Sequence, residues 1–127
     1  MAAYGSDEFP AFFTRRSGCP APARLDTPAQ AAAAIAAARC LGLGSGMVLA
    51  VPIPEAAAAT GAAVEGAIEA ALAEVQAAGV KGHAVTPFLL RRIQELTGGK
   101  SLQANIALVK HNASVGAAVA AELAQLA

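Results

Sequence analysis

The sequence predicts a helix-rich α/β fold that forms part of a larger domain, to which all of residues 1–127 belong. Two short apolar runs, 11–14 and 47–51, are typical of strands, and a helical pattern lies between them. Strands joined through a helix favour a parallel sheet that is covered on both faces, and two strands cannot form such a sheet alone. A pair of helices separated by glycines ends the chain.

Composition limits the size of the core and the class of partner. The chain has no net charge and only 14% charged residues, which argues against nucleic-acid binding. Hydrophobic residues reach 56%, but 36 of the residues are alanine, so little side-chain area is available to bury. We therefore expect a thin core, with helices that pack closely or pack on something outside this chain.

Targeting and metal-binding signals are missing from the sequence. The start MAAYGSDEFP lacks the basic and apolar regions of a signal peptide. Polar residues interrupt both alanine runs, so neither is expected to span a membrane. Cys19 and Cys40 are too few for a disulfide framework and have no Cys or His at zinc-ligand spacing, so we expect free thiols and a cytoplasmic protein.

The first half of the sequence contains few candidates for binding or catalytic residues. Arg15 and Arg16 follow the first extended run, either as a solvated strand end or as a clamp for phosphate or carboxylate. Thr27-Pro28-Ala29-Gln30 is a capping box that opens a helix to about Leu41. The glycines of 42–46 follow a helix and precede a strand, the reverse of a phosphate loop, so they indicate a helix stop and a tight connection.

The second half is predicted to be mostly helical. Pro52 and Pro54 end the strand at its carboxyl end, where open α/β sheets place ligands. A short alanine turn and Thr60 lead into a helix over 62–78, which Gly79 ends. One side of this helix carries the apolar residues Val64, Ile68, Leu72 and Val75, and the other carries the solvated carboxylates Glu65, Glu69 and Glu74. A brief extended link, 80–85, follows.

The final helical pair has clear sequence boundaries. Thr86 is expected to cap the first helix, with Pro87 at its first position, and Gly98-Gly99 stops it after Leu96. Ser101 is expected to cap the second helix, which continues to about Gln125. His83 and His111 have no Ser or Cys placed by sequence to form a nucleophile–base pair.

The last helix is predicted to have two unlike faces. An apolar stripe is formed by Ile106, Val109, Ala113, Ala117, Ala120 and Leu123. A second row, at steps of four, three and four residues, contains Ser101, Asn105, Leu108 and Asn112. Asn is a mediocre helix former, so this row is either a solvated face beside Lys110 and His111 or a pair of amides directed at a ligand's hydroxyls or phosphate.

Three segments carry a resemblance to a known family: YGSDEFPAFFTRRSG (4–18), LGLGSGMVLAVPIPE (41–55) and GVKGHAVTPFLLRRIQELTGGKSLQANIALVKHNA (79–113). They resemble the carboxy-terminal portion of the pseudouridine-5'-phosphate glycosidases, also called the indigoidine-synthase-A-like family. The resemblance implies an α/β/α-layered, homotrimeric, manganese-dependent enzyme. Such an enzyme reversibly cleaves the C–C glycosidic bond of a small nucleotide, pseudouridine 5'-phosphate, giving uracil and ribose 5-phosphate.

The resemblance also implies a mechanism and a division of roles. In the family, a lysine forms a Schiff base with the sugar's C1, a glutamate donates a proton and an aspartate holds manganese. All three lie upstream of the segment matching YGSDEFPAFF, so this chain is expected to supply no metal ligand and to be inactive alone. Lys81, Lys100 and Lys110 match other family segments and are not candidates for the nucleophile.

The family match carries one supporting catalytic residue onto this chain, Asn105, which is expected to hydrogen-bond the opened sugar or uracil. Asn112 is a weaker candidate for substrate binding. Arg15, Arg16 and Thr86 lie in family motifs without an assigned role. An alternative interpretation is a non-catalytic helical interaction module or the subunit of a split enzyme.

Overall fold

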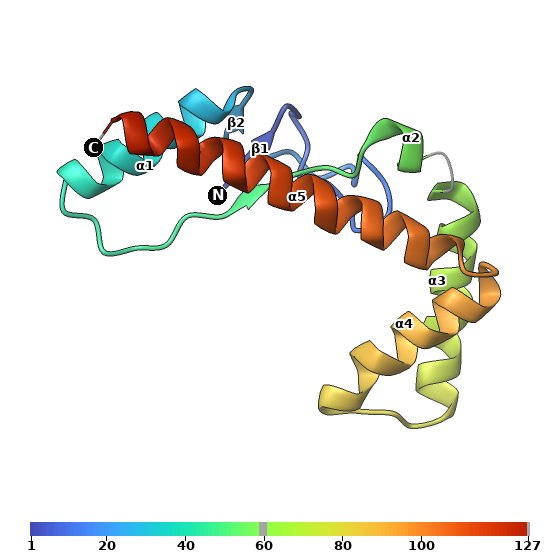
Figure 1. Cartoon of the computed structure of the whole chain (residues 1–127). Coiled ribbons are helices and arrows are strands. Elements are labelled where there is room, and N and C mark those ends of the chain that lie inside the picture. The colour runs from blue at the N-terminus through green and yellow to red at the C-terminus, as the bar shows by residue number, and fades with distance from the viewer. Residues whose placement is uncertain (59–60, 127) are drawn as a thin grey trace.

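The computed structural model describes residues 1–58 and 61–126. The elements are β1 (Ala2–Tyr4), β2 (Arg24–Leu25), α1 (Pro28–Cys40), β3 (Leu49–Ala50), α2 (Glu55–Ala58), α3 (Gly61–Ala77), the 3-10 turn η1 (Gly82–Ala84), α4 (Val85–Leu96) and α5 (Lys100–Gln125). In Figure 1, α5 crosses the molecule between the sheet with α1 at one end and the α3–α4 hairpin at the other. The predicted fold class, helix-rich α/β with a carboxy-terminal helical pair, is confirmed.

The sheet is parallel, as predicted, but its strands lie elsewhere. Its order is β2-β1-β3, and in the central strand Ala3 pairs with both Arg24 and Ala50. The predicted strand over 11–14 is wrong, because residues 12–14 form bends and residue 11 has no regular structure, and the predicted strand over 47–51 shortens to β3. Phe13 is nevertheless buried, so the aromatic residues in this run reflect burial in the core rather than strand pairing.

Local hydrogen bonds explain where α1 begins. The Thr27 hydroxyl accepts a hydrogen bond from the Gln30 N–H at 3.2 Å, and the Gln30 side chain accepts one from the Asp26 N–H at 2.6 Å. The predicted cap is therefore confirmed. The following connection is not tight: residues 41–48 form an extended loop that leaves the body of the molecule before returning to β3 (Figure 1).

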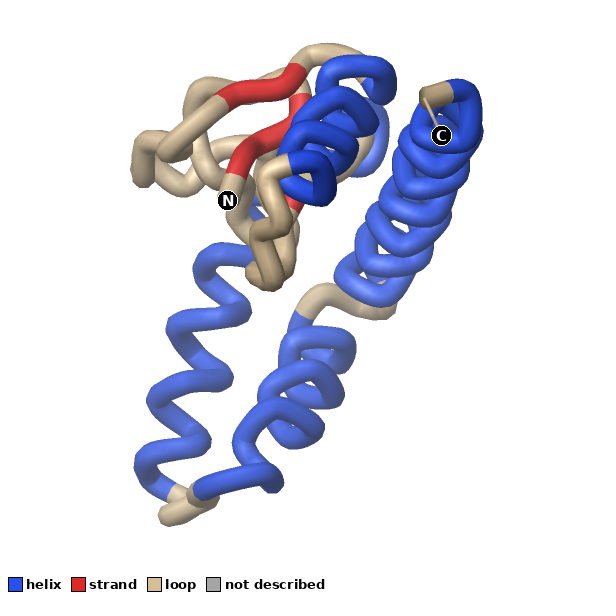
Figure 2. The backbone as a smooth tube through the Cα atoms, turned by 90° about the vertical axis from the view of Figure 1, so that its left-hand side faces the viewer, coloured by secondary structure: helices blue, strands red, loops and turns tan. Residues whose placement is uncertain are grey.

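Helices α3 and α4 lie side by side and project from the rest of the chain (Figures 1 and 2). The predicted helix over 62–78 corresponds to α3, while Thr60 lies outside the described residues. Val64 and Val75 are buried as predicted, but Leu72 is exposed and Ala67 and Ala71 are buried instead. Small alanine side chains on this face let the two helix backbones approach closely.

The start of α4 differs from the prediction by two residues. The expected extended link contains η1, and α4 begins at Val85 with Ala84 at its cap. Thr86 and Pro87 are therefore the second and third helical residues rather than the cap and the first. Proline is tolerated there because the first N–H groups of a helix have no partner within it.

Helix α5 also starts differently and presents a different face to the core. Gly99, with a φ of 84°, occupies the cap position, and Ser101 is buried inside the first turn. The Ser101 N–H donates to the Thr97 hydroxyl at 3.2 Å, so Thr97 supplies the side-chain acceptor that the sequence assigned to Ser101. The predicted apolar stripe is not the buried face: Ile106 is 47% exposed and Val109 is 58% exposed.

Two apolar clusters hold the chain together, and α5 contributes to both. The first contains Phe13, Ile53, Val64, Ala67, Ala71, Ile93 and Ala104. The second contains Ala31, Val115 and Val119, with Tyr4, Leu25, Ile35, Leu49 and Val51 packed against it. The largest fully buried side chains are Ile53 and Val64, in keeping with the expected thin core.

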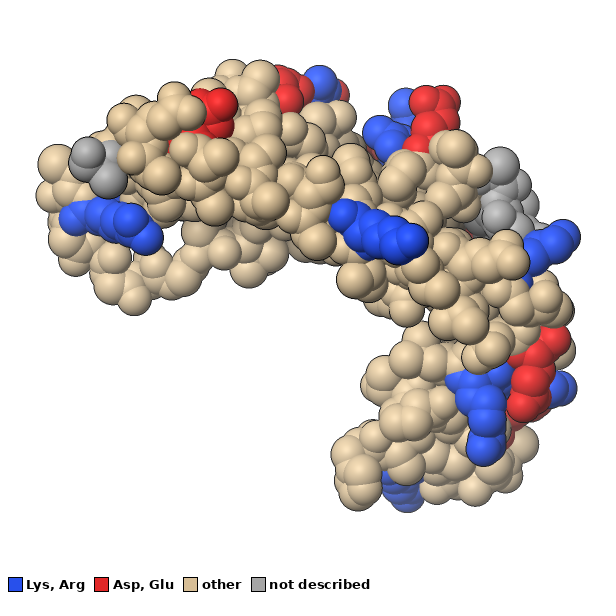
Figure 3. All heavy atoms as spheres, in the orientation of Figure 1, with Lys and Arg blue, Asp and Glu red and all other residues tan. Residues whose placement is uncertain are grey.

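The face of the molecule that carries α5 has few charged side chains. Figure 3 shows that Lys, Arg, Asp and Glu are sparse on the face that carries α5, which is hollowed where the α3–α4 hairpin bends away. Among the described residues, no helix combines the length and apolar character needed to cross a membrane.

Candidate functional site

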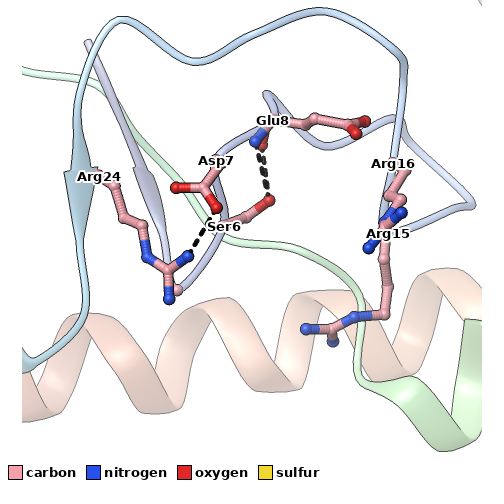
Figure 4. Close-up of a pocket in the computed structure, with 7 residues that line it drawn as sticks. Ser6, Asp7, Glu8, Arg15, Arg16 and Arg24 are labelled. Carbon is pink, nitrogen blue, oxygen red and sulfur yellow. Dashed lines mark hydrogen bonds and ion pairs between the residues drawn. The ribbon is translucent and has the colours of Figure 1, made fainter.

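A polar cavity of about 240 Å³ follows the carboxyl end of the central strand. Gly5, with a φ of 61°, turns the chain after β1, and the next three residues border the cavity. The segment after Phe13 approaches from the other side (Figure 4). The lining residues are Gly5, Ser6, Asp7, Glu8, Arg15, Arg16 and Arg24. The cavity therefore lies where parallel sheets commonly bind ligands.

The guanidinium of Arg24 is already held by carboxylates. Its Nε donates to Asp26 Oδ1 at 2.7 Å, and its Nη1 donates to Asp7 Oδ2 at 2.9 Å. These hydrogen bonds, first to Asp26 and then to Asp7, raise the pKa of Arg24 above its ordinary value. Arg24 thus joins β2 to the turn after β1 and fixes one wall of the cavity.

Arg15 and Arg16 line the same cavity, although neither is at a strand end. Arg15 is half-buried, and its Nη1 donates to the carbonyl oxygen of Ile53 at 2.8 Å. Arg16 is exposed, and its carbonyl accepts a hydrogen bond from the Thr14 hydroxyl at 2.7 Å. Of the two sequence interpretations, the arrangement fits an anion clamp better than a solvated strand end, because both side chains border one polar cavity.

Asn105 lies on α5, half-buried, at a smaller cavity of about 120 Å³. The other lining residues are Phe13, Leu90, Gln94, Ser101 and Leu102. An amide at such a mostly apolar wall can both donate to and accept from a ligand's hydroxyl or carbonyl. This geometry is compatible with the supporting role predicted for Asn105.

Asn112 is brought to a different place. It is exposed at the edge of a cavity of about 280 Å³ between α1, β3 and α5. Its neighbours there are the apolar or small residues Ala31, Ile35, Met47, Leu49, Val51, Val115, Gly116 and Val119. The structure therefore does not join Asn105 and Asn112 in one cavity, although both lie on α5.

The remaining candidates are scattered. Thr86 is exposed near the start of α4, and His111 is half-buried on α5. His83 is exposed at a cavity of about 410 Å³ near the tip of the hairpin, where the Arg91 guanidinium lies 5.9 Å from the centre of the Phe88 ring. Residues 1–58 and 61–126 contain no group of three or more His, Cys, Asp or Glu that could hold a metal ion.

Sequence reasoning missed Ser6, Asp7, Glu8 and Arg24 as cavity-lining residues. A local sequence pattern could have indicated the first three as a turn after a strand: Gly5 directly follows the apolar run Ala2-Ala3-Tyr4 and is itself followed by polar residues that favour turns. The pairing of Arg24 with Asp7 spans two strands and leaves no periodic pattern in the sequence.

The family model for indigoidine synthase A like proteins matches residues 1–122. The chain belongs to this family. The match includes the three arginines of the polar cavity as well as Asn105 and Asn112, and it confirms the predicted resemblance.

Several members of the family are closely similar to this chain. Three of them are named pseudouridine-5'-phosphate glycosidase. The protein from Arabidopsis thaliana is 52% identical over 99% of this chain, that from Deinococcus radiodurans is 52% identical over 96%, and that from a Nocardioides strain is 53% identical over 99%. The chain spans only 38%, 39% and 41% of those relatives. This share agrees with the predicted match to a carboxy-terminal portion of the family.

Two solved structures of this family type have the same fold. The prealnumycin C-glycosynthase AlnA, crystallised with ribulose 5-phosphate, matches 98% of this chain and 41% of its own, with a TM-score of 0.85 and 31% identity. An indigoidine synthase A-like protein from Thermotoga maritima matches 95% of this chain and 40% of its own, with a TM-score of 0.73 and 27% identity.

Proposed function

We propose that this chain is part of an enzyme that reversibly cleaves the C–C glycosidic bond of pseudouridine 5'-phosphate to uracil and ribose 5-phosphate. The observation that carries the proposal is the name shared by relatives that are 52–53% identical over nearly all of this chain. The ribulose 5-phosphate held by the C-glycosynthase neighbour is also a pentose phosphate, which supports a sugar-phosphate substrate.

In this proposal the chain forms one wall of the site through Asn105. Its amide is half-buried beside Phe13 and Ser101, so it is partly shielded from water and held on a rigid helix. There it hydrogen-bonds the opened sugar or the uracil carbonyl. Asn112, on the same helix, is the second candidate for substrate contact.

The bond-breaking groups are proposed to lie in other segments of the enzyme. A lysine nucleophile is activated by desolvation, whereas Lys81, Lys100 and Lys110 are all exposed. The described residues likewise do not fit manganese, because they bring no set of carboxylate or histidine ligands together. We therefore assign neither the Schiff base nor the family's manganese to this chain.

Two further features of the proposal concern its setting. Cys19 and Cys40 are both free and exposed, which supports a reducing compartment such as the cytoplasm. The exposed apolar residues of α5, including Ile106 and Val109, support assembly with other copies, and a homotrimer is the proposed state.

A chimera tests the proposed activity. This chain replaces the matching segment of the Deinococcus radiodurans relative, and uracil release from pseudouridine 5'-phosphate is measured by chromatography with manganese present. We expect the chimera to release uracil and the isolated chain to release none. Asn105→Ala in the chimera should slow turnover about tenfold or more, the effect of losing one hydrogen bond to the reacting substrate.

The matched control is Gln103→Ala, which removes an exposed amide from the same helix and should leave turnover unchanged. A folded chimera that releases no uracil would overturn the proposed function. Uracil release by the isolated chain would overturn the assignment of the reactive groups to other segments.

A second candidate function is a non-catalytic helical interaction module, favoured by the exposed apolar residues of α5. An experiment with the Deinococcus radiodurans relative distinguishes the interaction module from a subunit of a split enzyme. If the relative's other segment, added as a separate polypeptide, restores uracil release, the chain acts as an enzyme subunit; association without turnover supports the interaction module.

A further inference from the structure

We propose that the polar cavity bordered by Arg15 and Arg16 binds a phosphate group. Two sources are considered, inorganic phosphate and the phosphate of a sugar phosphate. The choice of a sugar phosphate rests on the proposed function, whereas the preference for phosphate rests only on the residues of the cavity.

The first argument is the charge that remains after the internal ion pairs are counted. Three guanidinium groups and two carboxylates line the cavity. Arg24 is held between Asp7 and Asp26, so this group is neutralised by its own neighbours. Arg15 and Arg16 then face one remaining carboxylate, that of Glu8, whose Oε2 accepts a hydrogen bond from the Gly18 N–H at 3.0 Å. Counted together with Asp26, the three arginines balance three carboxylates, so the group carries no formal net charge. Arg15 and Arg16 nevertheless form no ion pair among the described residues, and their guanidinium groups are therefore available to an anion.

The second argument is the way Arg15 is held. Its Nη1 donates to the Ile53 carbonyl, and Ile53 is fully buried in the first apolar cluster. One donor of the fork thus anchors the side chain to the core, while a guanidinium has further N–H groups to offer a ligand. Because the anchor orders the side chain in advance, little entropy is lost when an oxyanion binds.

The third argument is geometry. In Figure 4 the guanidinium groups of Arg15 and Arg24 extend from opposite sides of the cavity, beneath the turn that carries Ser6 and Asp7. Arg16 comes from the same segment as Arg15 and is exposed, so it can turn toward a bound anion. Planar guanidinium groups match phosphate oxygens in pairs, which distinguishes phosphate from chloride or other spherical anions.

The phosphate site and the Asn105 cavity can be separated by mutation. They share no lining residue, although Phe13 lines one and Arg15, two residues later, lines the other. A substitution in the arginine pair therefore tests phosphate binding without altering the amide proposed to contact sugar or uracil.

The test is titration of the full chain with inorganic phosphate, ribose 5-phosphate and ribose, by calorimetry and by the NMR chemical shifts of backbone amides and arginine side-chain N–H groups. We expect both phosphate-bearing ligands to bind, ribose not to bind, and shifts to concentrate at Gly5–Glu8 and at the arginine side chains. Arg16→Gln should raise the dissociation constant for phosphate about tenfold, because one charge-assisted hydrogen bond is lost. Added salt should weaken binding.

Arg39→Gln removes an equivalent charge from the end of α1 and should leave phosphate binding unchanged. Arg15→Lys keeps the charge but loses the paired N–H donors of the guanidinium group, so this substitution should also weaken phosphate binding. Equal affinity of the Arg16→Gln variant and the parent chain, or shifts confined to other regions, would overturn the inference. Binding without uracil release in the chimera leaves the inference standing and counts only against the proposed function.

Discussion

The two ends of α5 are packed in different ways. Near its start, Ala104 joins a cluster that contains the fully buried Ile53 and Val64, with side chains from several elements around them. Near its end, Val115 and Val119 meet the alanine-rich helix α1, and the surrounding sheet residues are only partly buried. The cavity of about 280 Å³ lies at this second end. The same helix thus packs against larger side chains near its start and mainly against the small side chains of α1 near its end.

The difference follows from side-chain size. α1 contributes mainly alanines to its contact with α5, and alanine carries little area to bury. At the first end, Ile and Val side chains converge from α3 and the segment after β3. Stability is therefore expected to concentrate at the first end, which also holds Ile53, the residue whose carbonyl accepts from Arg15.

The largest expected effect is at Ile53. Ile53→Ala should lower the free energy of unfolding by about 2–5 kcal/mol, the range for truncating a buried aliphatic side chain. Val119→Ala, at the other end of α5, should cost less, about 2 kcal/mol, because this truncation removes fewer carbon atoms than Ile53→Ala does. Chemical denaturation of the two variants gives both values. A larger loss for Val119→Ala would reverse the comparison between the two ends.

The sequence predicted which segments are helices more reliably than which faces of those helices are buried. Gly98 and Gly99 mark the break between α4 and α5 because both adopt a positive φ, a local property of glycine that does not depend on residues far away in the sequence. Which face of α5 is buried depends on what packs against it. Ile106 and Val109 form an apolar stripe as regular as the one containing Val115 and Val119, and alanines lie on both, so periodicity alone could not choose.

The strands and the polar cavity were harder to predict for a related reason. Ala2-Ala3-Tyr4 has little intrinsic strand preference, and it becomes the central strand because two other segments pair with it. The cavity brings Arg15 near Arg24 and Asp7 through that pairing. The family motif identified Arg15 and Arg16 as residues of interest, but only the fold shows that they line a common cavity.

An intermediate effect is expected on the outer face of α5. Ile106→Ser with Val109→Ser should change the free energy of unfolding by no more than about 0.5 kcal/mol, because both side chains are exposed. The double variant should, however, associate less, since an exposed apolar stripe favours contact with another protein surface. Sedimentation at several concentrations measures this change.

Leu72→Ser is the matched control, because Leu72 is exposed on α3 rather than on α5. If the control lowers association as much as the double variant does, the stripe on α5 has no special role. A large loss of stability in the double variant would instead mean that the stripe, and not the face with Val115, packs on the core.

The smallest expected effect is at the hairpin, where Arg92 Nε donates to Glu74 Oε2 at 2.6 Å and Arg92 Nη1 donates to Glu95 Oε2 at 2.9 Å. The hydrogen bond from Arg92 lowers the pKa of Glu74 below its ordinary value of 4.5, against the opposing effect of partial burial. A carboxylate with a lowered folded-state pKa stabilises the fold above its unfolded pKa and loses that contribution as pH falls through the folded value.

Glu74→Gln should therefore reduce stability slightly near neutral pH and make less difference at an acidic pH below the lowered pKa of Glu74, where the parent carboxylate is protonated in the folded state as well. Urea denaturation at the two pH values measures the change, and Glu69→Gln, an exposed carboxylate on the same helix, serves as the control. An equal loss at both pH values would show that Glu74 acts through packing rather than charge. The α3–α4 contact would then depend on its apolar residues rather than on the charge of Glu74.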